Sequence, residues 1–349
     1  MNAIVGGSAS QSRPTPAPRK IQAPRRLGSD RAFSFVSTSS GVLVLALMSA
    51  VGLFLAVRAI PALADAKGSF FTTADWQPDA HHFGIAAVMV GTILIGVVAV
   101  LFAVPLALGT ALYICEYAPP RIKRSLVSVV DLMAAVPSVI YGLWGLYFLT
   151  PHITGVSRWT ATYLGWVRVP WLPHMLHPFE VSGADLSDPL SSRTLFTSST
   201  LIAGLVVGLM VTPIVSSIMR EVFSRAPAGE REGAYALGAT KWGMIRSVVL
   251  PFGVGGMIGG TMLGLGRALG ETIAVYLVIS PVFVVQGHLL QNGTSSISSL
   301  IALRYGEASS LGISALMAAG LALFVVTLLV NFVAATIVGR SRSGATGDA

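Results

Sequence analysis

Two charged residues, Arg267 and Glu271, lie inside a strongly apolar stretch of this sequence, residues 251–280, and could carry chemistry there. They are four residues apart, so on a continuous helix they share one face. Each charge would cost about 2.5 to 3.5 kcal/mol at the centre of a membrane helix, which disfavours an unpaired position facing lipid. A guanidinium offers bidentate donors to an oxyanion, and the carboxylate orients that guanidinium or accepts a hydrogen bond from a protonated ligand. The pair predicts an anion site, with mutual neutralisation or a tether to another helix as the alternative.

Asp131 is another acidic residue within an apolar stretch, about seven residues after Arg124. We expect it either to line a solute pathway or to pair with a basic neighbour near the membrane surface. His174 and His177 have a spacing that can hold a metal, but no acidic or cysteine cluster completes a site, and Cys115 is the single cysteine. We therefore expect no metal site and no disulfide within the chain.

Nucleotide chemistry and nucleophilic catalysis both lack their motifs. A phosphate-binding loop of the Walker A type needs Gly-Lys followed by Ser or Thr, and none of the four lysines (Lys20, Lys67, Lys123, Lys241) follows a glycine. No nucleophile elbow accompanies the histidines. We expect a protein that is not an enzyme, holds no cofactor and takes its energy from a partner.

The elements that position these residues follow from the composition. The 349 residues are 53% hydrophobic and 11% charged, against about 25% charged residues in soluble domains. Apolar stretches long enough to cross a bilayer, which needs about 20 helical residues, occur at 36–57, 84–115, 125–150, 199–219, 251–280 and 311–338. We expect an all-α polytopic membrane protein with about six transmembrane helices, preceded by a disordered basic tail over residues 1–35.

The basic residues set the topology. Of the 23 Lys and Arg residues, 16 fall on one side if the chain crosses six times, and that side is cytoplasmic by the positive-inside rule. This places both termini in the cytoplasm, with a tail at 339–349 and a cytoplasmic loop at 224–250. External loops are then expected at 58–83 and 151–197. Topology also accounts for the net charge of +8, so nucleic-acid binding is not expected.

The cytoplasmic loop contains a spaced set of small residues around an acidic one: Glu232, Gly233, Ala234 and Gly238, followed by Leu250 and Pro251 at the start of an apolar stretch. A short helix that ends in a glycine turn can seat in a groove of a separate ATPase and transmit its motion to the membrane helices. The alternative is an ordinary charged loop, which does not require this spacing.

This loop resembles the EAA loop of the permeases of ABC importers, with Gly233 replacing the first alanine of the pattern. Stretches at 104–110 with 116–119, at 134–146 and at 266–272 are similar to phosphate-import permeases of the PstC type. The resemblance covers roughly residues 84–338, the expected permease core.

The resemblance implies a MetI-like permease fold in a bacterial cytoplasmic (inner) membrane. It also implies a heterodimer with a sister permease of the PstA type, two ATPase subunits of the PstB type that bind ATP and Mg, and an external phosphate-binding protein of the PstS type. Arg267 and Glu271 occupy positions associated with phosphate passage in that family. An importer of another oxyanion, an ATP-independent anion transporter or channel, and a membrane sensor that lines no pathway are the alternatives.

Overall fold

The computed structural model describes residues 28–66, 69–167, 179–181, 194–280, 283–285 and 287–342. The chain divides into two compact units, residues 1–51 and 52–349, and each is described by itself. Among the described residues, helices dominate, and the only sheet is a short antiparallel hairpin with Trp76 opposite Phe83.

The first unit contains most of α1 (Gly28–Asp65). The helix begins at Gly28, so the prediction of a disordered tail over residues 1–35 is wrong for its last eight residues, and residues 1–27 lie outside the description. The described side chains of this unit are exposed, including Phe35 and Leu45, and the helix is longer and more apolar than one bilayer crossing requires. Both properties fit a helix that lies in lipid.

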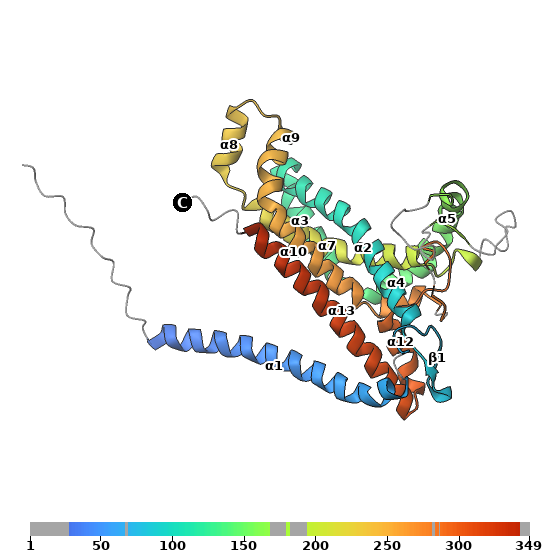
Figure 1. Ribbon diagram of the computed structural model, residues 1–349. Coiled ribbons are helices and arrows are strands. Elements are labelled where there is room, and N and C mark those ends of the chain that lie inside the picture. The colour runs from blue at the N-terminus through green and yellow to red at the C-terminus, as the bar shows by residue number, and fades with distance from the viewer. Residues whose placement is uncertain are drawn as a thin grey trace, which may run out of the picture. The chain divides into compact units, whose positions relative to one another are not determined.

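The second unit is built on four long helices that lie side by side: α2 (Ala86–Leu112), α7 (Thr200–Ser224), α10 (Leu250–Leu269) and α13 (Ser310–Arg342). Figure 1 shows α8 and α9 at one end of this bundle, and α12 and β1 at the other. α2 and α7 approach closely because small residues face the contact. A Cβ added at Gly204 of α7 would lie 2.4 Å from Val98 Cγ1 of α2.

Shorter elements connect and cover these helices. The strands and 3₁₀ turns are β1 (Trp76–Gln77), η1 (Pro78–Ala80), β2 (His82–Phe83) and η6 (Tyr305–Glu307). The π-helical turns are η2 (Tyr113–Tyr117), η3 (Gly145–Leu149) and η5 (Ile245–Val249). The remaining helices are α3 (Pro120–Ala134), α4 (Ser138–Trp144), α5 (Thr150–Leu164), α8 (Ala228–Ala236), α9 (Lys241–Met244), α11 (Ile273–Val278) and α12 (Ile297–Arg304).

Among the described residues, five helices are long and apolar enough to span a membrane, and a sixth span results if one bent pair is counted as one. That pair takes the place of the span expected at 125–150. α3 and the helix from Ser138 to Leu164 meet at an angle of 89°. Pro137 causes the bend, because a proline forces the residue before it out of the helical region, and Pro137 itself caps α4 with an extended ψ of 139°.

The predicted external loop at 151–197 begins as a helix instead, since α5 continues to Leu164. His174 and His177 fall outside the described residues. At the other end of the chain α13 runs to Arg342, four residues past the predicted end of the last span, and residues 343–349 lie outside the description.

Candidate functional site

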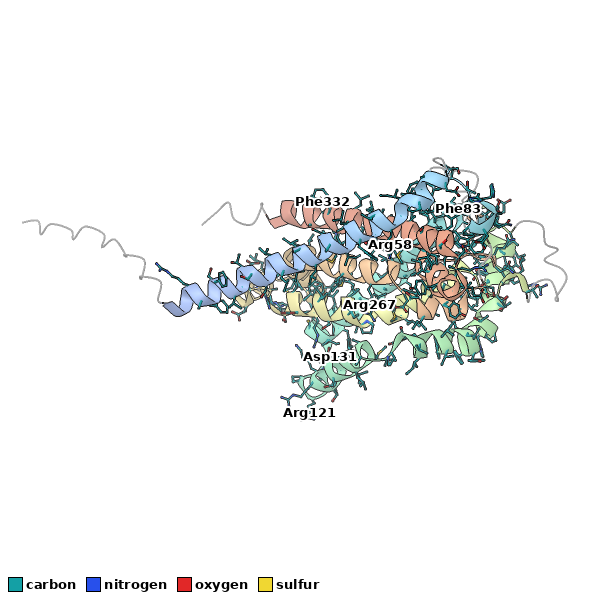
Figure 2. The ribbon with its side chains drawn as sticks, turned by 90° about the horizontal axis from the view of Figure 1, so that it is seen from below. Arg58, Phe83, Arg121, Asp131, Arg267 and Phe332 are labelled. Carbon is teal, nitrogen blue, oxygen red and sulfur yellow. The ribbon has the colours of Figure 1, made fainter. Side chains whose placement is uncertain are left out.

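The fifth apolar stretch is a broken helix, and the break carries Glu271, one of the predicted pathway residues. α10 ends at Leu269 and α11 begins at Ile273, which leaves residues 270–272, here called the break, in non-helical backbone. Arg267 lies in the last turn of α10, exposed and between the two ends of the bundle (Figure 2). Because the helix ends between them, the prediction that Arg267 and Glu271 share a continuous helix face is wrong.

Glu271 supports the break. Its Oε1 accepts a hydrogen bond from Ala274 N at 3.2 Å, so the side chain caps the first turn of α11, and its own N–H donates to Ala268 O at 3.3 Å. A side chain that bonds to nearby backbone in this way competes with helix continuation.

Arg267 makes no salt bridge with any residue that the structure describes. The guanidinium is therefore available to a ligand.

A group of buried hydroxyls lies beside the break and was missed from the sequence. Ser298 Oγ donates to Glu271 O at 2.7 Å, Ser296 caps α12, and Thr92 Oγ1 of α2 accepts from Ile297 N at 2.9 Å. Ser296, Ser298 and Thr92 are all buried. The signal available in the sequence was the hydroxyl-rich run at 294–299 in an otherwise apolar chain.

Close backbone contacts hold the break between neighbouring helices. A Cβ at Gly142 of α4 would lie 2.9 Å from Ala274 Cα of α11, and one at Gly91 of α2 would lie 2.1 Å from Ser295 O. Neither position tolerates a side chain without movement of backbone. In a membrane, non-helical backbone is stable only where it is buried in protein or lines a water-filled cavity. The packed glycines and buried hydroxyls provide such surroundings for the break, and Arg267 beside it carries a guanidinium that can donate two hydrogen bonds to an oxyanion.

Asp131 is paired rather than free. Arg220 Nη2 donates to Asp131 Oδ1 at 3.3 Å and to Ser217 Oγ at 3.3 Å. Arg220 lies on α7, which continues to Ser224, five residues past the predicted end of this stretch at 219. Of the two expectations for Asp131, the structure shows the pairing with a basic residue. The Arg220 guanidinium compensates the charge of the carboxylate, so no ligand is needed to explain it.

The loop predicted to contact an ATPase forms α8 and a tight turn. Glu232 and Gly233 are exposed on α8, and Ala234 is half-buried. Gly238 adopts φ +84°, and its N–H donates to Tyr235 O while Ala239 N donates to Ala234 O. This is a Schellman motif, which needs a residue in the left-handed region directly after the helix. The spacing between Ala234 and Gly238 therefore has a backbone cause.

The chain then re-enters the bundle without interruption. Thr240 caps α9 by accepting from Gly243 N at 3.1 Å, and α9, η5 and α10 together form one continuous span from Lys241 to Leu269. Within this span Leu250 and Pro251 follow directly after the π-helical turn η5, so Pro251 lies in the interior of the continuous helix. One helix thus connects the turn after α8 to Arg267.

Comparison with known proteins identifies the family. Residues 103–343 match the family model described as "Binding-protein-dependent transport system inner membrane component". The chain belongs to this family.

Several relatives are similar over nearly their whole length. The phosphate transport system permease protein PstC 2 of Mycobacterium tuberculosis is 38% identical over 325 residues, which cover 92% of this chain and 95% of that protein. PstC of Mycobacterium leprae is 38% identical over 336 residues, covering 95% and 99%. A chain of the inward-facing MetNI methionine ABC transporter covers 74% of this chain and 95% of its own length, at 14% identity and a TM-score of 0.48.

Proposed function

We propose that this chain is the permease subunit of an ATP-driven importer of inorganic phosphate, and that it works by alternating access. The observation that carries the proposal is the continuous helix from Lys241 to Leu269, which joins the exposed α8 turn to Arg267 at the break. A movement imposed on α8 from outside the membrane reaches the guanidinium through this rigid element. The names of the relatives supply the cargo.

In this proposal Arg267 binds phosphate oxygens and Glu271 positions the anion or relays a proton near the break. Glu232, Gly233, Ala234 and Gly238 form the surface that a separate ATPase contacts, with Leu250 and Pro251 leading into the membrane. ATP and Mg belong to that ATPase. Because Asp131 is satisfied by Arg220, the proposal assigns the pathway to Arg267 and Glu271 alone.

The assembly follows from the same argument. A sister permease of the PstA type completes the pathway, two PstB-type ATPase subunits face α8, and a PstS-type protein delivers phosphate on the opposite side. We place the end of the bundle with α8 and α9 in the cytoplasm of a bacterial inner membrane, and the distribution of basic residues places both termini on the same side. The exposed helix faces in the second unit, such as Leu132 and Tyr147, suit lipid or the sister permease.

The test is uptake of radiolabelled phosphate by the complete complex in liposomes. Arg267→Gln keeps hydrogen-bond donors but removes the charge, so we expect at least a tenfold lower uptake rate from a complex that assembles normally. Arg58→Gln is the matched control, since Arg58 is an exposed cation outside the break, placed over the Phe54 ring at 5.7 Å. Wild-type uptake by the Arg267→Gln complex would contradict the assigned role.

Two further measurements separate the alternatives. We expect excess sulfate or molybdate to leave phosphate uptake unchanged. In an importer for one of those oxyanions, the excess anion would compete with phosphate and lower its uptake. An ATPase subunit that cannot hydrolyse ATP should abolish uptake, whereas an ATP-independent transporter or channel would keep it.

A further inference from the structure

Arg231 is the residue through which α8 is anchored to the membrane helices. Most side chains of α8 are exposed, and Arg231 and Ala234, three residues apart, are the half-buried ones. Arg231 Nη1 lies 3.0 Å from Glu116 Oε1 of η2, and Nη2 donates to Phe223 O at the end of α7 at 2.6 Å. One guanidinium therefore joins α8 to the ends of two other helices.

Glu116 makes this contact more than a surface ion pair. Its side chain is 6% exposed, and that of Arg231 is 23% exposed. A buried carboxylate must be compensated, and removing one partner of a buried pair is far more disruptive than breaking an exposed one. Within the described part of the chain, the salt bridge of Glu116 is to Arg231. α8 must therefore stay where Arg231 can compensate the buried Glu116 carboxylate.

A second basic residue of the same loop contacts the same turn. Lys241 Nζ lies 4.7 Å from the centre of the Tyr117 ring, in cation–π geometry. Arg231 precedes the Gly238 turn and Lys241 follows it in the chain. The segments on both sides of the turn therefore contact η2. η2 is π-helical, with Ala118 N bonded to Tyr113 O at 2.8 Å, and such turns are uncommon and concentrate at functional positions.

The contact with Phe223 continues to α10. The Phe223 side chain is fully buried, and a Cβ at Gly253 would lie 2.3 Å from its Cε1. One turn of helix later, a Cβ at Gly256 would lie 2.4 Å from Val222 Cγ2. α10 therefore rests directly on the end of α7 that Arg231 holds, and it cannot shift without moving that end.

We propose that Arg231 is a coupling residue, whose two contacts transmit movement of α8 to η2 and α7 and from there to α10 and the break. The proposal rests on the proposed function, in which α8 receives its movement from an ATPase. Its neighbour Glu232 is exposed on the side that a partner can reach, whereas Arg231 points into the bundle. Glu232 is thus placed to contact the ATPase, and the preceding residue, Arg231, contacts the membrane helices.

The experiment measures ATP hydrolysis and phosphate uptake together in the reconstituted complex. We expect Arg231→Gln to lower the uptake per ATP hydrolysed at least tenfold while hydrolysis stays within about twofold of wild type. Arg231→Lys keeps the charge near Glu116 but cannot reach both partners with a fork, so we expect a loss of about threefold. The control is Arg225→Gln, whose exposed pair with Glu221 should leave both rates unchanged.

A second variant guards against simple misfolding. Arg231→Gln alone leaves a buried carboxylate uncompensated, whereas Glu116→Gln combined with Arg231→Gln leaves no buried charge. We expect the double variant to regain assembly and thermal stability but not the uptake per ATP hydrolysed. Recovery of wild-type coupling in the double variant, or an unchanged ratio in Arg231→Gln, would overturn the inference and leave Arg231 a structural role only.

Failure of the proposed function would look different. In that case the wild-type complex itself would show no phosphate uptake that depends on ATP. A working wild-type complex with normally coupled Arg231 variants would contradict the coupling role alone.

Discussion

Arg220 and Asp131 join α7 to α3, with Nη2 of the arginine 3.3 Å from Oδ1 of the aspartate. The two ends differ in environment, since Arg220 is 20% exposed and Asp131 is 52% exposed. The carboxylate is thus the more open end of the pair, and we expect the pair to contribute about as much to stability as an exposed ion pair. The contact gives an acidic residue in an apolar stretch a structural reason to be there.

This pairing predicts a mild effect for Asp131→Asn. The amide oxygen still accepts from Arg220, so we expect phosphate uptake within about twofold of wild type. Arg220→Met removes the donor and should destabilise the complex by about 1 kcal/mol, measured as a lower midpoint of thermal unfolding. A fully assembled Asp131→Asn complex without uptake would instead show that Asp131 lines the pathway.

The contact between α10 and α7 predicts that alanine substitutions at two glycines of α10 change stability to different extents. A Cβ at Gly264 would lie 2.6 Å from Cγ2 of the buried Val215, whereas a Cβ at Gly259 has nothing within 4 Å. Gly264→Ala should cost about 1 to 3 kcal/mol by overpacking, and Gly259→Ala should cost nothing measurable. Thermal unfolding of the purified complex distinguishes them, and equal midpoints would show that α7 and α10 adjust freely.

α8 and the turn that follows it predict effects of opposite sign on stability for substitutions at Gly233 and Gly238. Gly238 has φ +84°, so Gly238→Ala should destabilise the turn by about 1 to 2 kcal/mol although space is open around it. Gly233 lies within the helix with nothing near its Cβ position, so Gly233→Ala should stabilise α8 by about 1 kcal/mol. Hydrogen exchange of the α8 amides reports both changes. Faster exchange in Gly233→Ala would contradict the assignment.

The sequence predicted the membrane helices better than their interruptions. Apolar length is a strong signal because a bilayer demands about 20 residues, and five of the six stretches correspond to single long helices in whole or large part. Proline is a weak signal here, since Pro61, Pro105 and Pro213 lie inside long helices while Pro137 bends one by 89°. The difference depends on whether neighbouring helices satisfy the freed backbone groups, which local sequence does not encode.

The sequence singled out individual charged residues, but it did not predict their contacts. A charge in an apolar stretch is conspicuous, and this singled out Arg267, Glu271 and Asp131. The partner of Asp131 is 89 residues away on α7, and the partner of Arg231 is Glu116, from an entirely different part of the chain. No periodicity relates such pairs, because they arise from packing between helices rather than along one.

Glu271 allows its charge to be separated from its hydrogen bond. The Oε1 atom accepts from Ala274 N at 3.2 Å, and the amide oxygen of glutamine can do the same. Glu271→Gln should therefore keep the break intact and leave thermal stability at the wild-type value, while phosphate uptake falls at least tenfold because the carboxylate is gone. Glu271→Ala removes the cap as well and should cost about 1 kcal/mol of stability in addition to uptake. If Glu271→Gln imports phosphate at the wild-type rate and Glu271→Ala is merely unstable, the residue acts only as a cap, and Arg267 alone faces the anion.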